Sequence, residues 1–249
     1  MIEMKTSAIV VTGASGGIGS GVVEGLLRRG YKNVAGLYHT AEHAEHLKAI
    51  FSGYEQNPLE HIFQADITQE ADVKGAVDQA ATQLGPIMGL INCAGTTSNG
   101  LSWKLDSGEF LRIQKVNLLG PFHACKAVLP KMREQSQGRI VNISSILSVK
   151  GMAGTAHYSA SKAGLNGMTR ALAAEVAAKG ITVNSIALGY FDVGMIETIP
   201  EKLREEVKAT IPKKRFGHIQ EVVALVDYLL GDDADYITGQ VIHINGGLY

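Results

Sequence analysis

The sequence has few cysteines and almost no net charge. Cys93 and Cys125 are its only two cysteines, too few for the disulfide framework of a small secreted protein and consistent with a reducing compartment. The 23 basic and 24 acidic residues leave a net charge of −1, so nothing global favours nucleic acid or an anionic membrane as a partner. We therefore expect a cytoplasmic protein that binds neither.

Long hydrophobic runs are also lacking. The uncharged stretch that begins at Leu84 is interrupted by Gly85, Pro86, Asn92 and Gly95, which excludes it as a membrane span. The first five residues lead directly into an apolar run and lack the layout of a signal peptide. What is abundant is hydrophobic residues (45%) and glycine (29 residues), a composition typical of a globular α/β protein with tight turns beside its strands.

Short apolar runs alternate with helical patterns along the whole chain. Strand-like runs cover residues 8–11, 34–38, 62–65, 88–93, 139–143, 182–188 and 240–245, and helical patterns cover 20–29, 41–51, 70–84, 107–131, 154–179 and 220–230. No repeat or linker divides residues 1–249. The alternation predicts a single-domain, Rossmann-type α/β fold: a doubly wound parallel sheet of about seven strands with helices on both faces. Ligands of such sheets bind at the carboxyl ends of the strands.

A glycine-rich turn follows the first expected strand and precedes the first expected helix. Its sequence is Thr12-Gly13-Ala14-Ser15-Gly16-Gly17-Ile18-Gly19. Glycine lets the backbone approach a pyrophosphate, and a helix amino terminus supplies free N–H groups with a positive dipole end. The spacing Gly-x-x-x-Gly-x-Gly differs from the Gly-x-Gly-x-x-Gly form. We interpret the turn as a dinucleotide site whose candidate contacts are Gly13, Ser15, Gly16, Gly17, Ile18 and Gly19.

Tyr158 and Lys162 stand four residues apart in the alanine-rich helical pattern, so they share a helix face. An ammonium beside a phenol favours the phenolate and lowers a pKa that is ordinarily about 10. Such a tyrosine can exchange a proton with a substrate oxygen near neutral pH. The alternative for an isolated pair of this kind is an ordinary surface contact.

Taken together, these motifs resemble the short-chain dehydrogenase/reductase family. The resemblance covers nearly the whole chain and lies in the glycine turn, Asp66-Ile67, Asn92-Cys93-Ala94-Gly95, Asn117, Ser145, and Tyr158 with Lys162. It implies a catalytic tetrad. Tyr158 is the acid/base, Ser145 hydrogen-bonds the substrate oxygen, Lys162 binds the nicotinamide ribose and lowers the tyrosine pKa, and Asn117 holds a water. It also implies cofactor contacts from Tyr158, Lys162, Asp66, Ile67, Asn92, Ala94, Gly95, Gly189 and Phe191, with no metal.

Some of these residues have simpler readings. Ser145 could only terminate a strand, Asn117 could be a satisfied core amide, and Asp66 could cap the helix that starts near Gln69. The sequence also departs from the family pattern at four positions. Cys93 replaces an asparagine, a change expected to alter packing more than chemistry, and Leu188 replaces a proline, which makes its loop less constrained. Val193 replaces a threonine that in the family often contacts the carboxamide of the nicotinamide. Gly16 stands where many NADP-dependent members have arginine.

The second strand indicates which cofactor binds. It is followed by His39 and Thr40, with no acid before Glu42, whereas an acid there would select NAD by accepting hydrogen bonds from the ribose. We therefore expect NADP, contacted by His39. His39, His43 and His46 could mimic a metal cluster, but we expect them to be surface residues because no cysteine lies nearby.

The last third of the chain resembles the 3-oxoacyl-[acyl-carrier-protein] reductases within that family, through residues 211–217 and 236–247. This implies NADPH-dependent reduction of a 3-oxoacyl thioester, bound to acyl carrier protein or coenzyme A, by a homotetramer of fatty acid biosynthesis. A dehydrogenase or reductase of another secondary alcohol or ketone is the alternative, and a non-catalytic nucleotide-sensing protein is a third. Residues 190–215 are expected to form a substrate lid. We expect its basic run, Lys213, Lys214 and Arg215, to bind the carrier's phosphate; a solvated turn is the alternative.

Overall fold

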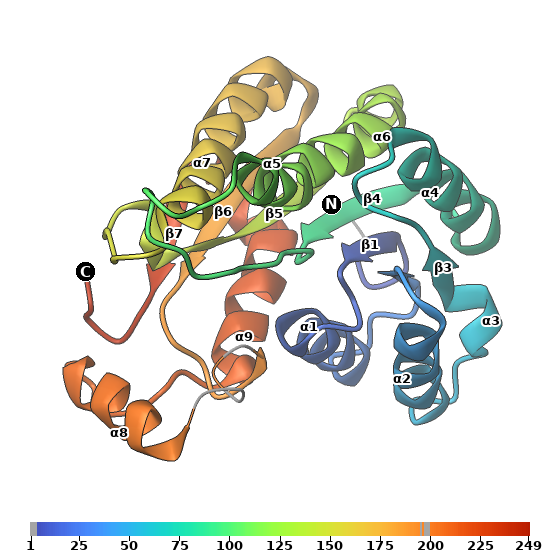
Figure 1. Ribbon diagram of the computed structural model, residues 1–249. Helices are drawn as coiled ribbons and strands as arrows, with labels where there is room; N and C mark the ends of the chain where they lie inside the picture. The colour runs from blue at the N-terminus through green and yellow to red at the C-terminus, as the bar shows by residue number, and fades with distance from the viewer. Residues whose placement is uncertain (1–3, 195, 197–199) are drawn as a thin grey trace.

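The computed structural model describes residues 4–194, 196 and 200–249. All seven of its strands form one parallel sheet in the order β3-β2-β1-β4-β5-β6-β7 (Figure 1). The strands are β1 (Ala8–Thr12), β2 (Val34–Tyr38), β3 (Ile62–Gln64), β4 (Ile87–Asn92), β5 (Gly138–Ser145), β6 (Ile181–Leu188) and β7 (Val241–Ile244). The chain moves outward from β1 to β3 and then returns to β4, so the strand order reverses between β1 and β4. The expected doubly wound α/β fold is confirmed, and its ligand crevice is predicted at that reversal.

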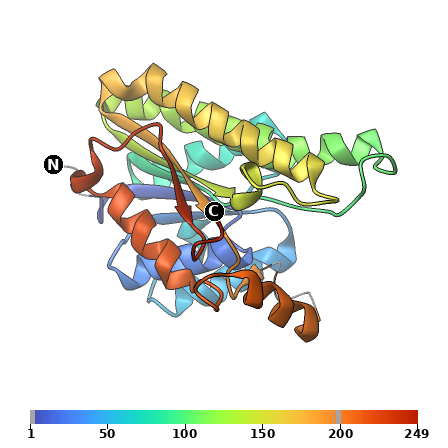
Figure 2. The same cartoon turned by 90° about the vertical axis from the view of Figure 1, so that its left-hand side faces the viewer.

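Helices cover both faces of the sheet, as Figures 1 and 2 show from two directions. One face carries α1 (Gly17–Arg28), α2 (Ala41–Ser52) and α9 (Ile219–Leu230), and the other carries α4 (Glu70–Leu84), α6 (Gly120–Gln135) and α7 (Ala156–Val176). The remaining helices are α3 (Pro58–His61), α5 (Ser107–Gln114) and α8 (Glu201–Thr210). Helix α5 runs beside α7, and α8 lies away from the sheet, beyond the carboxyl ends of the strands (Figure 1).

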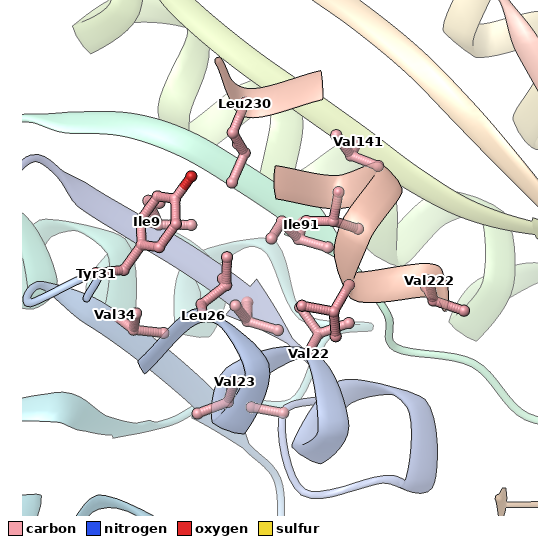
Figure 3. Close-up of a cluster of buried hydrophobic side chains, with 14 of the residues drawn as sticks. Ile9, Val22, Val23, Leu26, Tyr31, Val34, Ile91, Val141, Val222 and Leu230 are labelled. Carbon is pink, nitrogen blue, oxygen red and sulfur yellow. The ribbon is translucent and has the colours of Figure 1, made fainter. Parts of the chain in front are cut away.

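The central strands are apolar on both faces because helices cover both. In β1, Ile9 and Val11 pack toward α1 and α9, whereas Ala8 and Val10 pack toward α4 and α6. Figure 3 shows the first of these two cores, where Val22, Val23 and Leu26 of α1 and Val222 and Leu230 of α9 gather over Ile9, Ile91 and Val141. A strand buried on both sides reads as a continuous apolar run, which is why the short runs predicted strands well.

Glycines allow α1 to pack closely against α9. A Cβ at Gly25 would lie 2.5 Å from Val223 Cγ1, and one at Gly21 would lie 2.3 Å from Ile219 Cγ1. The resulting contact holds α1 at a fixed angle to the sheet. It therefore also fixes where the amino terminus of α1 points.

Most expected elements are confirmed within a few residues, but the helix expected over 107–131 is not continuous. A π-helical turn (Lys115–Leu119) separates α5 from α6. Residues 1–3 of the expected amino-terminal segment and residues 195 and 197–199 of the expected lid lie outside the described residues. Within the described chain, no helix is long and apolar enough to cross a membrane.

Candidate active site

The glycine turn lies between β1 and α1, beside the strand-order reversal. Gly13 has φ +61°, and a Cβ there would lie 2.6 Å from Ala94 Cα, so the position requires glycine for both reasons. A Cβ at Gly17 would lie 2.6 Å from Gly194, and one at Gly19 would lie 2.1 Å from Gly13 O. The turn is therefore packed as bare backbone against the loops that follow β4 and β6.

The amino terminus of α1 suits an anion. Its N-cap residue, Gly16, is exposed and makes no side-chain capping hydrogen bond. The first N–H groups of a helix require acceptors, and the helix dipole favours a negative charge at this end. Ser15 is half-buried in the turn, and the Ile18 side chain, also half-buried, packs against the core. The donor set fits the pyrophosphate of a dinucleotide.

His39 and Asp66 lie near each other beyond the ends of β2 and β3. His39 is exposed, and its proximity makes a small contribution to lowering the pKa of Asp66. Burial opposes that shift, but hydrogen bonds to Asp66 Oδ1 from the Thr68 N–H (2.9 Å) and hydroxyl (2.8 Å) hold the pKa below its ordinary value. Asp66 thus closes a turn just before α4, whose N-cap is Gln69. Ile67 follows in the same turn, and its side chain packs against Gly120.

Four polar side chains form a row across the sheet. Thr12, Asn92, Asn142 and Ser185 are successive register partners on β1, β4, β5 and β6. Thr12 Oγ1 donates to Asn92 Oδ1 (3.4 Å), and Asn92 Nδ2 donates to Asn142 Oδ1 (2.9 Å). Asn142 Nδ2 then donates to Thr169 Oγ1 of α7 (2.9 Å), which also contacts Ser185 Oγ (2.8 Å). The row joins β1, β4, β5, β6 and α7 beneath the crevice.

This row was not predicted, except for Asn92, and it changes how Asn92 is understood. The Asn92 side chain is buried at 1% exposure and committed to Asn142, so it supports the site from below rather than offering its amide to a cofactor. Thr12 Oγ1 accepts from the Ala94 N–H (3.3 Å). The polar row therefore positions the loop that begins with Ala94 and Gly95.

Asn117 lies in the π-helical turn and is fully buried. Its Oδ1 accepts from the Thr96 N–H (2.8 Å), and its Nδ2 donates to Thr96 O (2.9 Å) and to Ser161 Oγ (3.1 Å). A Cβ at Gly95 would lie 3.5 Å from Lys162 Nζ and 3.6 Å from Asn117 Oδ1. Asn117 is thus a satisfied amide, and it also places the Gly95 loop against α7 next to Lys162. π-Helical turns are frequent at functional sites.

Ser145, Tyr158 and Lys162 converge at the carboxyl end of β5. Tyr158 and Lys162 share a face of α7, with the Lys162 ammonium 5.9 Å from the centroid of the Tyr158 ring. Lys162 Nζ donates to Ile143 O (2.9 Å). Ser145 Oγ accepts from the Leu147 N–H (3.1 Å), and the Ser145 hydroxyl lies close enough to Tyr158 to lower the pKa of its phenol. The structure therefore brings together all three residues that the family pattern singles out here.

The pKa values of this group differ in one respect from the sequence expectation. Burial raises the pKa of Tyr158, while the hydrogen bond with Ser145 lowers it, and the net effect is a rise. Burial lowers the pKa of Lys162 to about 8, and burial raises that of the neighbouring Cys93 thiol to about 12. The expected fall in the Tyr158 pKa is therefore wrong for the protein alone, because desolvation outweighs its polar contacts.

Residues after β6 lie close to the glycine turn, but their side chains differ from the expected pattern. Leu188 is buried at the end of β6, paired with Ser145 on one side and Ile244 on the other, so the position is not the less constrained loop that we expected. Gly189 N–H donates to Ile244 O (2.8 Å). The Phe191 side chain belongs to the core beneath α9, which leaves only its backbone for a cofactor.

The basic run and the histidines also have distinct outcomes. Arg215 forms a two-pronged ion pair with Glu221 (2.8 and 2.7 Å), so it is not the free phosphate ligand that we expected. Lys213 and Lys214 remain exposed. His39, His43 and His46 are exposed surface residues, as expected. In the part of the chain that the structure describes, no group of three His, Cys, Asp or Glu residues could hold a metal ion.

Comparisons with known proteins extend over nearly the whole chain. A family model described as enoyl-(acyl carrier protein) reductase matches residues 13–249. Nodulation protein G of Azospirillum brasilense is 38% identical over 248 residues, which cover 98% of this chain and 99% of that protein. The 3-oxoacyl-[acyl-carrier-protein] reductase FabG of Staphylococcus aureus strain N315 is 36% identical over 245 residues (98% of each chain), and that of Staphylococcus epidermidis is 37% identical over 250 residues (99% and 100%). The matched residues include every candidate site residue.

Proposed function

Because the chain belongs to the short-chain dehydrogenase/reductase family, we propose that it reduces a 3-oxoacyl thioester to the 3-hydroxyacyl product with NADPH. The observation that carries this proposal is the convergence of Tyr158, Ser145 and Lys162 beside the open amino terminus of α1. A proton donor, a second hydroxyl and a buried cation meet at the edge of the sheet where a dinucleotide would bind.

The reaction needs hydroxyl donors where negative charge develops on the carbonyl oxygen. A nicotinamide held there would supply the hydride for the carbonyl carbon. Ser145 donates a hydrogen bond to the carbonyl oxygen, and Tyr158 transfers its phenolic proton to it. A raised pKa keeps Tyr158 protonated at neutral pH, as a proton donor in the direction of reduction must be. Lys162, with its pKa of about 8, still carries its charge at neutral pH and stabilises the phenolate as it forms.

Three regions of the chain support the cofactor assignment. The glycine turn and the helix α1 would hold the pyrophosphate, and Asp66 with Ile67 would contact the adenine. The exposed His39 directly follows β2, and no acid precedes Glu42. His39 would therefore bind the 2′-phosphate that distinguishes NADP from NAD. Gly16 provides no cation there, so we expect preference for NADPH rather than exclusion of NADH.

Relatives and surface charge support a carrier-bound substrate. FabG proteins that match this chain are named 3-oxoacyl-[acyl-carrier-protein] reductases, and Lys213 and Lys214 lie exposed just after α8. We propose that α8 and its flanks, within residues 190–215, form the lid over the thioester, and that the two lysines attract the phosphate of acyl carrier protein or coenzyme A. Two free cysteines, Cys93 and Cys125, accord with action in the reducing cytoplasm.

An apolar groove supports assembly into a homotetramer. It is formed by α5, the π-helical turn, α6 and α7, and its lining includes Leu111, Leu118, Leu119, Phe122 and Met168. Leu111 is 55% exposed and Phe122 is 40% exposed. A second copy of the chain is the proposed occupant, because contiguous exposed apolar surface marks protein interfaces. Sedimentation of the variant Phe122→Asp should give smaller particles than the unmodified protein.

A second candidate function remains within the same chemistry. Nodulation protein G is as similar to this chain as the FabG proteins are, and its name specifies no substrate. The alternative is therefore an NAD(P)-dependent dehydrogenase or reductase of another secondary alcohol or ketone. A non-catalytic nucleotide-sensing protein would not need the Tyr158–Ser145 contact.

The deciding experiment compares NADPH oxidation with several ketone substrates. Acetoacetyl thioesters of acyl carrier protein and of coenzyme A are assayed against simple, cyclic and steroidal ketones. A kcat/KM for a thioester well above that for every simple ketone supports the proposal. Preference for a simple ketone favours the second candidate, and NADPH binding without turnover of any substrate favours the non-catalytic protein.

A further inference from the structure

His157 is a fully buried histidine immediately before Tyr158. Its Nε2 lies 3.0 Å from Ser98 O and 2.9 Å from Ser98 Oγ. Because a backbone oxygen only accepts hydrogen bonds, Nε2 carries the ring proton. Nδ1 has no hydrogen-bond partner among the described residues. The ring is therefore committed on one side only, to the loop that follows β4.

Ser98 is held from its other side by a charged pair. The Arg112 guanidinium, followed by the Ser98 hydroxyl, lowers the pKa of Glu109 to about 2. Arg112 bonds both oxygens of Glu109, at 2.6 and 2.8 Å. The Glu109 carboxylate thus lies near the Ser98 hydroxyl, while the Ser98 carbonyl accepts from His157. The side chains of two elements, α5 and α7, meet on this one serine.

The first turn of α7 depends on such contacts from outside. Its N-cap residue, Thr155, makes no side-chain capping hydrogen bond. Gln114 Nε2 donates to His157 O (2.7 Å), and the Gly100 N–H donates to Gly154 O (3.0 Å). A helix end without a cap is held by the groups packed against it. Here the helix end that carries Tyr158 is held by α5 and the loop after β4.

We propose that His157 is a positioning residue: by joining Ser98 to the first turn of α7, it holds the Tyr158 hydroxyl within reach of Ser145. This role rests on the proposed function of Tyr158 as the proton donor. The same loop contacts Asn117 through Thr96, so the link joins the tetrad residues to one another. Small displacements of a reacting group lower turnover strongly, by up to about 100-fold for ~1 Å.

The test uses His157→Leu and its matched control His157→Gln, in the full-length protein. Leucine removes the donor to Ser98, whereas glutamine places an N–H donor near the position of Nε2. His157→Leu should lower kcat for ketone reduction about tenfold or more while changing the Kd for NADPH less than about threefold. His157→Gln should recover most of the lost kcat. Equal impairment of the two folded variants would overturn the proposal.

A pH profile separates positioning from simple loss of stability. In the reverse reaction, oxidation of the 3-hydroxyacyl thioester, Tyr158 must be ionised, and its contact with Ser145 lowers its pKa. Displacing the phenol should move the midpoint of kcat/KM to higher pH in His157→Leu, by about half a unit or more. A lower melting temperature with an unshifted midpoint would show a purely structural role and overturn the proposal.

Two further variants keep the outcome decisive. If His157→Leu does not fold, His157→Asn takes its place, because its shorter side chain cannot place a donor at the position of Nε2, 3.0 Å from Ser98 O. It should lower kcat by roughly threefold and shift the midpoint in the same direction, and an unchanged kcat and midpoint would overturn the proposal. Tyr158→Phe is assayed in parallel. If it retains turnover, the proposed function fails; if it is inactive while the His157 variants match the unmodified protein, only the role of His157 fails.

Discussion

The Lys162 ammonium lies one helical turn from Tyr158, 5.9 Å from the centroid of its ring, and donates its hydrogen bond to Ile143 O rather than to the phenol. Both groups are buried. Burial lowers the pKa of the lysine to about 8 and raises that of the tyrosine. Near neutral pH the protein therefore holds a charged ammonium and a neutral phenol side by side, which is the arrangement that a reductase needs before it donates a proton.

Replacing Tyr158 with phenylalanine removes the proton donor and little else. The ring stays within its buried site, and Lys162 keeps its bond to Ile143 O. We expect kcat for ketone reduction to fall about 10²–10⁴-fold, with the Kd for NADPH changed less than about threefold. Steady-state kinetics and fluorescence titration of NADPH measure the two quantities. Unchanged kcat in the folded variant would contradict the assignment of Tyr158.

Lys162→Met should stabilise the protein at neutral pH while it abolishes most turnover. In the unfolded chain the lysine stays protonated up to its ordinary pKa of 10.5, whereas burial lowers the native pKa to about 8. The unfolded state therefore binds more protons between these values, so the stability of the unmodified protein rises with pH across that window. Below pH 8 the buried charge costs on the order of 3 kcal/mol, and methionine avoids this cost.

Urea unfolding of both proteins from pH 7 to pH 10.5 measures the effect. The free-energy advantage of Lys162→Met should be largest at pH 7 and should shrink as the pH rises beyond 8. Lys104→Met, at an exposed position, serves as the control and should show no such trend. A difference that is constant with pH would mean that Lys162 is not buried as a charged group.

Ser145→Ala tests whether Ser145 tunes Tyr158. Its hydroxyl lowers the Tyr158 pKa against the larger effect of burial, so its loss should raise that pKa. The pH midpoint of alcohol oxidation should move upward, and kcat should fall by roughly 10²-fold or more because one donor to the substrate oxygen is removed. Ser144→Ala is the matched control, because the Ser144 hydroxyl donates to Lys162 O (3.3 Å). It should leave the midpoint unchanged.

Local patterns predicted much of this fold. A strand covered on both faces must be apolar throughout, so the four apolar residues 8–11 were enough to predict β1. The glycine turn was predicted because only glycine lets the backbone approach a neighbouring group so closely. The interruption of the helix at residues 115–119 could not be predicted from the sequence. A π-helical turn needs no glycine or proline, and its only effect on the pattern is to shift the spacing of the apolar residues. Asn117, which lies there, was identified through resemblance rather than periodicity.

Contacts between distant segments were beyond the sequence. Asn142 and Ser185 are polar residues in apolar strands, and their partners depend on a register that only the assembled sheet defines. Arg215 reads as part of a basic run until α9 places Glu221 against it. Phe191 follows a strand end where a ligand contact is expected, yet the α9 core takes up its ring. In each case the tertiary packing determined the role of the residue, which the local sequence alone could not.

Asn142→Val should destabilise the protein through its partners. Asn142 accepts from Asn92 and donates to Thr169, so valine removes one hydrogen bond from each of two buried polar groups, at a cost of about 0.5–1.5 kcal/mol each. Urea unfolding measures the loss. In a double-mutant cycle, Asn92→Val with Asn142→Val should lose less than the sum of the single changes. Additive losses would show that the two amides do not interact.

Charge reversal of Lys213 and Lys214 tests how the thioester carrier is recognised. Arg215 is paired with Glu221, which leaves these two lysines as the exposed charges of the run. Lys214 Nζ also donates to Ala209 O (2.7 Å), so Lys213→Glu is the cleaner single change. For an acyl-carrier-bound substrate we expect KM to rise roughly three- to tenfold, most strongly at low salt, because the attraction is screened by ions.

The control substrate is a small uncharged ketone, for which KM should stay the same. The control variant is Lys32→Glu with Lys179→Glu, two exposed lysines that precede β2 and β6 and so lie at the amino edge of the sheet, opposite the site. That variant carries the same change in net charge, so any rise in KM that comes from the protein's overall field appears in both variants. A rise confined to the Lys213 and Lys214 variant, absent with the small ketone and reduced by salt, would locate carrier recognition beside α8. Equal effects on both substrates would instead show that the basic run shapes the substrate cleft.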